Sequence, residues 1–276
     1  MEKIKFIDYT KRNFNRIIII VAIWVWLSGK VGGKYPIHCR EEFIFMNIAL
    51  ILSGGTGTRL GSNIPKQYIE VNGRMIISYC LELFCEHSNI DKIQIVAERE
   101  WHEEILKEVE KYDTKHKFCG FSSPGEIRQT SILYGLSDIR KYANDSDYVL
   151  IHDAARPLLS SEMVSDCFDA IWGHDGVIPV LAMKDTVYFS EQGKTIDSLL
   201  NRNKIYAGQA PEVFQLGKYY SATIALLPGE IFNINGSTEV AIMAGMDVVM
   251  IPGDEKNFKI TTKADLERFQ AMLVDL

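Results

Sequence analysis

From residue 46 onward, short apolar runs alternate with longer segments in which apolar residues recur every three to four positions. The short runs predict strands at 47–52, 92–97, 117–121, 148–151, 176–181 and 247–251. The periodic segments predict helices at 75–86, 101–112, 129–142, 161–172, 216–225, 238–245 and 262–274. Near-continuous apolar strands that alternate with helices are typical of a mainly parallel sheet covered on both faces. We therefore predict a doubly wound α/β fold, in which ligands bind beyond the carboxyl ends of the strands.

The alternation breaks between Lys184 and Pro211. Two strand-like segments at 185–190 and 194–198 flank a turn-forming tripeptide at 191–193, and this pattern predicts a β-hairpin. A hairpin inserted into a doubly wound sheet forms either a protruding arm, of the kind that often contacts a second copy of the chain, or an exposed loop excursion. The pattern alone leaves both interpretations open.

The first 45 residues differ in character from the rest. Basic residues precede an apolar run, Ile17 to Leu27, which is shorter than the roughly 20 residues that a bilayer requires. Such a start is typical of a signal peptide, but no small-x-small cleavage site follows. Glu41-Glu42 can be encoded by a purine-rich stretch that resembles a ribosome-binding site shortly before Met46. We hypothesise that residues 1–45 are an untranslated, non-native or disordered extension, and that residues 46–276 form the domain.

Composition narrows the possible functions. The net charge of −6 argues against non-specific nucleic-acid binding, yet it leaves room for a local basic pocket. The five cysteines show no CxxC spacing, which disfavours a zinc site and a secreted disulfide framework. We therefore expect a cytoplasmic protein that binds neither membrane nor nucleic acid.

A glycine-rich segment follows the first predicted strand. Gly54, Gly55 and Gly57 lack Cβ atoms, so the backbone can adopt positive φ and present N–H groups to anionic oxygens. Arg59 adds a planar fork suited to phosphate, and Lys66 a mobile charge. The spacing fits neither a Walker loop nor a dinucleotide fingerprint. The segment indicates a polyphosphate site, the alternative being a glycine turn beside two solvated cations.

Two further segments follow predicted strands. Asp153 is well placed to hold a Mg²⁺ ion that bridges phosphate oxygens, or else to cap the following turn. For His152 we favour a packed or solvated imidazole. Lys259 lies between Phe258 and Ile260, so alternation directs its side chain to the opposite face, where a solvated lysine is the ordinary explanation.

Four motifs occur in order along the chain: Gly-Gly-x-Gly-x-Arg-Leu-Gly followed by Pro65-Lys66-Gln67, His-Asp-Ala-Ala-Arg-Pro at 152–157, Gly-Gln-Ala-Pro at 208–211, and Asn-Phe-Lys-Ile-Thr-Thr at 257–262. Together they resemble the cytidylyltransferases of sugar-alcohol phosphates, which act on 2-C-methyl-D-erythritol 4-phosphate or ribitol 5-phosphate. The resemblance covers Met46–Leu273. It implies a Rossmann-like nucleotidyltransferase in which a polyol phosphate attacks the α-phosphorus of CTP with the help of Mg²⁺.

The resemblance also implies roles for individual residues. Catalytic roles fall to Arg59, Lys66, Arg202 and Lys259, and the metal ligand is Asp153. The nucleotide-binding residues are Leu50, Ser53, Gly54, Gly55, Gly57, Gly125, Glu126, Arg128 and Ser131. The substrate-phosphate residues are Thr186, Arg202, Lys259 and Arg156. The hairpin at about 184–205 resembles the family's dimer arm, so Thr186 and Arg202 are expected to serve the partner's site in a homodimer.

Two stretches depart from the family pattern. Ala210 and Glu212 stand where the family often has Thr and Gln, and residues 236–239 match neither consensus. The glycine loop is more similar to ribitol-phosphate enzymes and the 152–157 motif to methylerythritol-phosphate enzymes, so the sequence leaves the alcohol open. The alternatives are a hexose-1-phosphate nucleotidyltransferase and a non-catalytic nucleotide-binding subunit on the same fold.

Overall fold

A computed structural model describes residues 45–55 and 64–274 of the chain. The chain divides between Ile44 and Phe45, and the fold below is that of Phe45–Leu276. Gly57 and Arg59 of the glycine loop lie outside the described residues, as does nearly all of the 1–45 extension.

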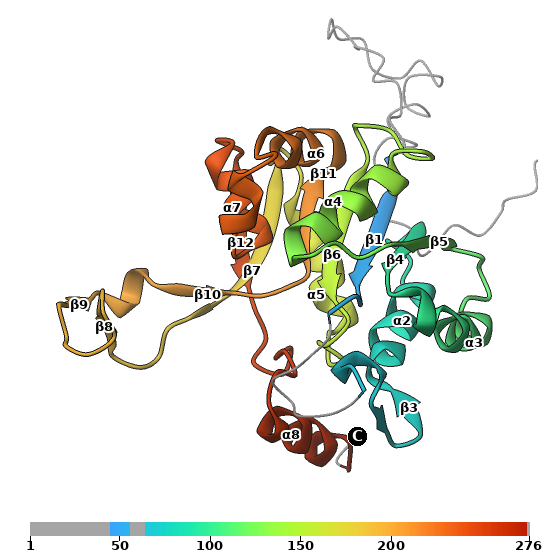
Figure 1. The fold of residues 1–276 in the computed structure, drawn as a ribbon, viewed down its shortest axis with the longest axis horizontal. Helices are drawn as coiled ribbons and strands as arrows, with labels where there is room; N and C mark the ends of the chain where they lie inside the picture. The colour runs from blue at the N-terminus through green and yellow to red at the C-terminus, as the bar shows by residue number, and fades with distance from the viewer. Residues whose placement is uncertain (1–44, 56–63, 275–276) are drawn as a thin grey trace, which may run out of the picture. The chain divides into compact units, whose positions relative to one another are not determined.

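A central sheet of eight strands organises the domain (Figure 1). Its strand order is β10-β7-β11-β6-β1-β4-β5, and β12 pairs with β7. The parallel part pairs β1 with β4 and β6, β4 with β5, and β7 with β12. Its strands are β1 (Asn47–Leu52), β4 (Lys92–Val96), β5 (Phe118–Ser122), β6 (Tyr148–Asp153), β7 (Gly176–Ala182) and β12 (Val248–Pro252). The prediction of these six strands is confirmed.

Two strands of the sheet run antiparallel, and the sequence did not predict them. They are β10 (Tyr206–Gly208), which pairs with β7, and β11 (Glu212–Gln215), which lies between β6 and β7. Both are short and follow polar or proline-containing stretches, so neither shows an apolar run or a clear alternation. The sheet is therefore mixed, with its parallel part at the strands that carry the predicted motifs.

Helices cover both faces of the sheet, as predicted (Figure 1). One face packs against α2 (Ile76–Glu86), α3 (His102–Tyr112) and α5 (Ser161–Ala170), and the other against α4 (Arg128–Ile139), α6 (Leu216–Ala225) and α7 (Ser237–Met243). Strand β1 supplies both layers: Ala49 and Ile51 belong to the first apolar cluster, and Ile48 and Leu50 to the second. Burial on both faces explains why this strand reads as a continuous apolar run.

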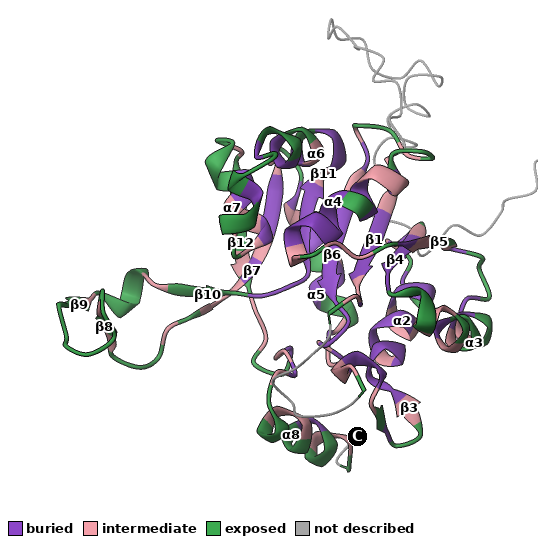
Figure 2. Cartoon of the chain, viewed as in Figure 1, coloured by how far each residue is buried: buried purple, intermediate pink, exposed green. Residues whose placement is uncertain are grey.

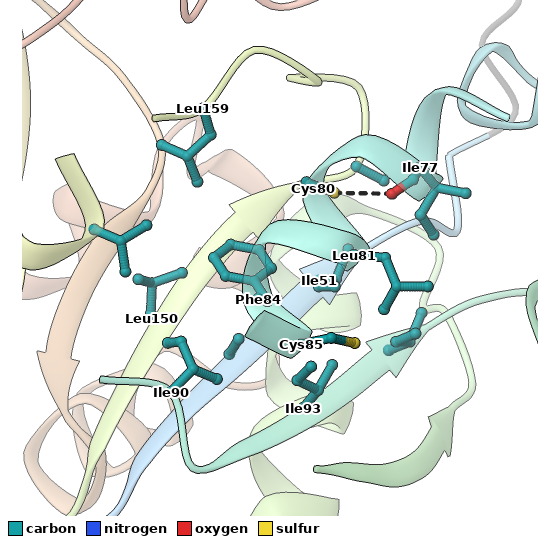
Figure 3. Close-up of a cluster of buried hydrophobic side chains, with 14 of the residues drawn as sticks. Ile51, Ile77, Cys80, Leu81, Phe84, Cys85, Ile90, Ile93, Leu150 and Leu159 are labelled. Atoms are coloured by element: carbon teal, nitrogen blue, oxygen red, sulfur yellow. Dashed lines mark hydrogen bonds between the residues drawn. The ribbon is translucent and has the colours of Figure 1, made fainter. Parts of the chain in front are cut away.

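The first of these clusters fills the space between α2 and the sheet (Figure 3). Leu81 and Phe84 of the helix lie against Ile51 and Ile93 of the strands, and all four are fully buried. Burial of each such side chain contributes about 1.5–3 kcal/mol to folding. The buried residues therefore concentrate in the strands and the inner helix faces (Figure 2).

The last helix, α8 (Lys263–Val274), is held by a separate small cluster. Phe269 packs with Val71, Ile76 and Ile260, which joins this helix to the short β2 (Glu70–Val71) and β3 (Arg74–Met75) hairpin region and to the start of α2. The segment before α8, which carries Lys259, is thereby fixed at both ends.

An exposed arm leaves the sheet after β7 and returns through β10 (Figures 1 and 2). Its tip is an antiparallel hairpin of β8 (Val187–Phe189) and β9 (Ser198–Leu200). The predicted hairpin is confirmed, but the second strand was wrongly placed at 194–198. Side chains close the longer loop instead: Asp197 accepts a hydrogen bond from the Glu191 N–H at 2.7 Å, and Ser190 from the Gly193 N–H at 2.9 Å.

The remaining described elements are four short 3-10 helices, η2 (Lys66–Tyr68), η3 (Arg99–Trp101), η4 (Arg202–Lys204) and η5 (Glu230–Asn233). Among the helices in the described part of the chain, none has both the length and the apolar character needed to cross a membrane.

Candidate active site

The site lies where β1 and β6 end side by side. Leu52 pairs with Asp153 in register, and the Ala154 N–H donates to the Leu52 carbonyl at 3.0 Å. Because the two strands are parallel, the start of the glycine loop and the 152–157 motif emerge from the same edge of the sheet, as the sequence predicts.

Two side chains of η2 hold the start of the glycine loop. The Gln67 amide donates to the carbonyls of Ser53 and Gly55, at 2.6 and 2.8 Å. The Tyr68 hydroxyl lies 2.9 Å from the Ser53 hydroxyl and 2.8 Å from the Ser53 carbonyl. Burial raises the pKa of Tyr68 to about 12, so its hydroxyl stays protonated at neutral pH. Neither residue was predicted to have a role, although Gln67 belongs to the Pro65-Lys66-Gln67 motif.

Gly54 is required by a close approach, and not by its backbone angle. A Cβ at this position would lie 2.4 Å from the Cβ of Pro124, whereas a Cβ on Gly55 would meet no atom of the described residues within 4 Å. Neither glycine has positive φ, which corrects the expectation that these glycines adopt a left-handed backbone. The absent side chain of Gly54 instead lets the loop lie against the segment that leads into α4.

Asp153 is the centre of the charged cluster. Its Oδ1 lies 3.3 Å from Nε of Arg128, and its Oδ2 lies 3.0 Å from Nζ of Lys259 and 3.5 Å from Nε of Arg156. Burial by itself raises the pKa of this carboxyl, but the three cations outweigh that effect and hold the pKa far below its usual range. Asp153 is therefore ionised throughout the physiological pH range.

Lys259 lies on the loop that follows β12, and Arg156, in the turn after β6, contacts that loop. Arg156 donates to the Asn257 carbonyl at 2.6 Å, and the Ile260 N–H donates to the Ala155 carbonyl at 2.8 Å. The Lys259 side chain keeps a third of its surface exposed, whereas that of Arg156 is 13% exposed. Arg156 therefore braces the loop, and Lys259 presents the more accessible charge.

Side chains of the β10–β11 connection and of the β12–α8 loop complete this bracing. The Gln209 amide donates to the Asp254 carbonyl at 2.9 Å, and its Oε1 accepts from the Asp254 N–H at 3.0 Å. The buried Asn257 donates to the Ala210 carbonyl at 2.7 Å. Gln209 and Asn257 belong to motifs noted in the sequence, but no role was predicted for either amide.

The predicted nucleotide residues on the other side of the site form a tight loop. The Gly125 N–H donates to the Ser131 hydroxyl at 2.9 Å, and that hydroxyl donates to the Ile127 carbonyl at 3.0 Å. A Cβ on Gly125 would lie 2.1 Å from the Thr130 hydroxyl oxygen. Ser131 thus shapes the loop, while Glu126 is exposed at its tip. Arg128, at the start of α4, connects this loop to the cluster through its contact with Asp153.

Some predicted residues do not meet this cluster within one chain. Leu50 is fully buried in the core beneath α4, where a Cβ on Gly135 would lie 2.5 Å from its side chain. The β1 run is apolar on both faces, so the pattern could not tell Leu50 from a residue that lines the site. Thr186 and Arg202 lie on the exposed arm, where Arg202 donates to the Lys184 carbonyl at 2.7 Å. Lys66 begins η2 and is half-buried.

His152 is a packed imidazole, as favoured from the sequence. It is fully buried, meets the ring of Phe84 edge-on at 5.4 Å, and its Nε2 lies 3.1 Å from the Arg156 carbonyl. Burial lowers the pKa of His152 to about 4, so the ring is neutral at physiological pH. As the donor to that carbonyl it shapes the turn that carries Asp153.

Asp153 is compatible with Mg²⁺ as a single protein ligand. Among the residues that the structure describes, no group of three or more His, Cys, Asp or Glu side chains could hold a metal ion. Mg²⁺ is commonly bound by one or two carboxylates together with substrate phosphates and water. An ionised carboxylate offers about four acceptor positions, which is more than the three cation contacts use.

Comparisons with known proteins identify the family of the chain. The sequence profile of the 2-C-methyl-D-erythritol 4-phosphate cytidylyltransferase family matches residues 47–275. The chain is 31% identical to the 2-C-methyl-D-erythritol 4-phosphate cytidylyltransferase of Thermosipho melanesiensis, over 80% of this chain and 95% of that one. It is 32% identical to the ribitol-5-phosphate cytidylyltransferase of Streptococcus pneumoniae, over 83% of this chain and 99% of that one.

A solved structure supports the same assignment. The 4-diphosphocytidyl-2C-methyl-D-erythritol synthase of Anaerococcus prevotii superposes with a TM-score of 0.72 at 27% identity, covering 83% of this chain and 96% of that one. The fold, the order of the motifs and the charged cluster at the ends of β1 and β6 are all in place. The chain therefore belongs to the 2-C-methyl-D-erythritol 4-phosphate cytidylyltransferase family and is a cytidylyltransferase.

Proposed function

We propose that the protein condenses CTP with a sugar-alcohol phosphate, either 2-C-methyl-D-erythritol 4-phosphate or ribitol 5-phosphate, at the Asp153 cluster. A phosphate oxygen of the alcohol forms a bond to the α-phosphorus of CTP. The bond from that phosphorus to the bridging oxygen breaks, and pyrophosphate leaves with the electron pair. The observation that carries the proposal is the junction of Asp153, Arg128, Arg156 and Lys259 beside the glycine loop.

The cations of the site suit this reaction. Negative charge accumulates on the α-phosphoryl oxygens and the leaving pyrophosphate, and fixed cations stabilise it without further reorganisation. Lys259 would face the α-phosphoryl group, since it is the most exposed cation on Asp153. Arg59 and Lys66 of the glycine-loop region would bind the pyrophosphate portion. Asp153 would hold Mg²⁺, which supplies charge neutralisation on the phosphates when it is bound.

The nucleoside would lie between the glycine loop and the 125–131 loop. The contact of Gly54 with Pro124 brings the two loops together, and their main-chain groups suit the hydrogen bonds of a base and a ribose. The residues that we assign to this half of the site are Ser53, Gly54, Gly55, Gly57, Gly125, Glu126, Arg128 and Ser131. The side chain of Leu50 is buried in the core beneath this half of the site.

The experiment that tests this function is pyrophosphate release with CTP, UTP or GTP against methylerythritol phosphate, ribitol phosphate and glucose 1-phosphate. We expect turnover with CTP and a polyol phosphate only, and the preferred alcohol identifies the substrate. UTP with glucose 1-phosphate as the best pair would establish the hexose-1-phosphate alternative. CTP binding without turnover for any alcohol would favour a non-catalytic subunit.

A further inference from the structure

The two departures from the family pattern, at Glu212 and at 236–239, contact each other. Glu212 Oε1 accepts from the N–H and from the hydroxyl of Thr238, at 3.0 and 2.7 Å. These residues come from β11 and from the first turn of α7, which are distant in the sequence. Glu212 and Thr238 therefore form one hydrogen-bonded unit.

That unit also contacts the guanidinium of Arg128. Glu212 Oε2 lies 3.5 Å from one terminal nitrogen of the guanidinium, and the other terminal nitrogen donates to the Ser237 hydroxyl at 2.5 Å. The remaining nitrogen, Nε, faces Asp153 at 3.3 Å. All three nitrogens of the planar fork thus have a partner, and each partner comes from a different element.

Burial makes the arrangement rigid. Ser237 is fully buried, its carbonyl accepts from the Tyr219 hydroxyl at 3.0 Å, and the Glu212 side chain is 8% exposed. A buried carboxylate is costly unless it is paired, so Glu212 constrains Arg128 as strongly as Arg128 constrains Glu212. Burial by itself lowers the pKa of Arg128, and the carboxylates of Asp153 and Glu212 more than reverse that effect.

We propose that Glu212, with Ser237 and Thr238, is a positioning group that fixes Arg128 against Asp153 and thereby sets the affinity of the site for CTP. Glu212 touches no reacting atom in the proposed reaction. Its effect passes through Arg128, on the nucleotide side of the site. The inference rests on the proposed function for its consequence and on the contacts of Arg128 for its mechanism.

The test removes the carboxylate of Glu212 and introduces a carboxylate at position 237. Glu212→Gln keeps the side-chain shape and an acceptor for Thr238 but removes the charge that faces Arg128. Ser237→Asp places a carboxylate where the Ser237 hydroxyl already accepts from Arg128, at a helix start that favours an acidic residue. In the double variant Arg128 again has two carboxylate partners.

We expect Glu212→Gln to raise the KM for CTP about tenfold while kcat stays within about threefold, since one charge-assisted contact is lost. Ser237→Asp alone, which gives Arg128 a third carboxylate, should also raise the KM. The double variant should return to within about threefold of the parent, a strongly non-additive result. Glu230→Gln, the same change at an exposed position in η5, is the matched control and should behave as the parent.

A second measurement follows Arg128 directly. The Nε–H signal of Arg128 in a ¹H–¹⁵N spectrum, assigned by its loss in Arg128→Lys, should be protected from solvent exchange in the parent. Protection should fall in Glu212→Gln and recover in the double variant. A purely structural strut would instead lower the melting temperature of Glu212→Gln, with no rescue by the second substitution.

The two readouts separate the inference from the proposed function. If the parent turns over CTP but Glu212→Gln has unchanged KM and unchanged Nε–H protection, the inference is overturned and the function stands. If the parent shows no turnover with CTP, the proposed function fails. The positioning role is then judged on the Arg128 signal alone, and protection that Glu212→Gln leaves intact overturns it.

Discussion

The cations of the site differ in how far their side chains are exposed. Arg156 is largely covered and braces the Asn257 carbonyl, whereas Lys259 keeps a third of its side-chain surface exposed. The same partner, Asp153, orients both of them. The two cations therefore call for different experiments, one on stability and one on catalysis.

Changing Lys259 to Ala should lower kcat about 10²-fold or more, as loss of one transition-state charge contact typically does. The free energy of unfolding should change little, because the lysine is partly exposed and Arg128 and Arg156 still neutralise Asp153. Steady-state pyrophosphate release and denaturant unfolding measure the two quantities. Lys263→Ala, an exposed lysine on α8, is the control. Near-parent turnover in Lys259→Ala would refute the catalytic role.

At this scale the sequence predicted residue types better than their partners. Asp153 and Lys259 were singled out separately from their own motifs, and the structure joins them at 3.0 Å. The support of Ser53 by Gln67 and Tyr68 was missed, because the loop carbonyls that these side chains contact depend on the tertiary path of the chain. The side chain of Leu50 is fully buried in the core, and its role at the nucleotide stays a prediction.

Among the elements, the glycine loop and the 124–127 segment depend on each other. They meet where Gly54 lies against Pro124. The close approach of these two loops, which are far apart in the sequence, therefore depends on the absence of a side chain at Gly54. This contact is a packing constraint, and it acts before any ligand arrives. A single methyl group can therefore test it.

We expect Gly54→Ala to destabilise the domain by about 1–3 kcal/mol, the usual cost of forcing extra volume into a packed site. Gly55→Ala should stay within about 0.5 kcal/mol, because no atom of the residues that the structure describes lies within 4 Å of the added Cβ and the φ of Gly55 is not positive. Urea unfolding of both variants measures the difference. Equal stabilities would show that the loops separate freely.

The elements themselves were largely predictable. The strands of the parallel part and the helices were found from their periodicity, and helix α6 has the predicted bounds, Leu216–Ala225. Strands β10 and β11 were missed, since three or four residues are too few for a period to show. The second strand of the arm was displaced because Ser190 and Asp197 close a long loop that no local propensity marks.

At the scale of the whole molecule, the arm, which includes Thr186 and Arg202, protrudes from the sheet (Figure 1). It also exposes Tyr188, Phe189 and Leu199, each by half or more of its surface. An arm with these exposed apolar side chains suits an interface with a second copy. We propose a homodimer in which each arm completes the partner's site.

Mixing two inactive variants tests this arrangement. Lys259→Ala damages the chain's own site, and Arg202→Ala damages the partner's, so a mixed dimer retains one intact site. Dissociation and reassociation of an equal mixture should restore about a quarter of the parent activity, the share expected from random pairing. Activity that stays at the level of the separate variants would mean that Arg202 serves its own chain or none. Light scattering of the parent checks the dimer itself.

The cluster around Asp153 holds three cations against the two carboxylates of Asp153 and Glu212, within a chain of net charge −6. A nucleoside triphosphate is therefore repelled at long range by the net negative charge of the chain, and it is attracted by the three cations only at short range. Electrostatic screening acts over about 8 Å at physiological ionic strength. Added salt should accordingly speed the encounter while it loosens the bound state, so that the association rate and the affinity respond to ionic strength in opposite directions.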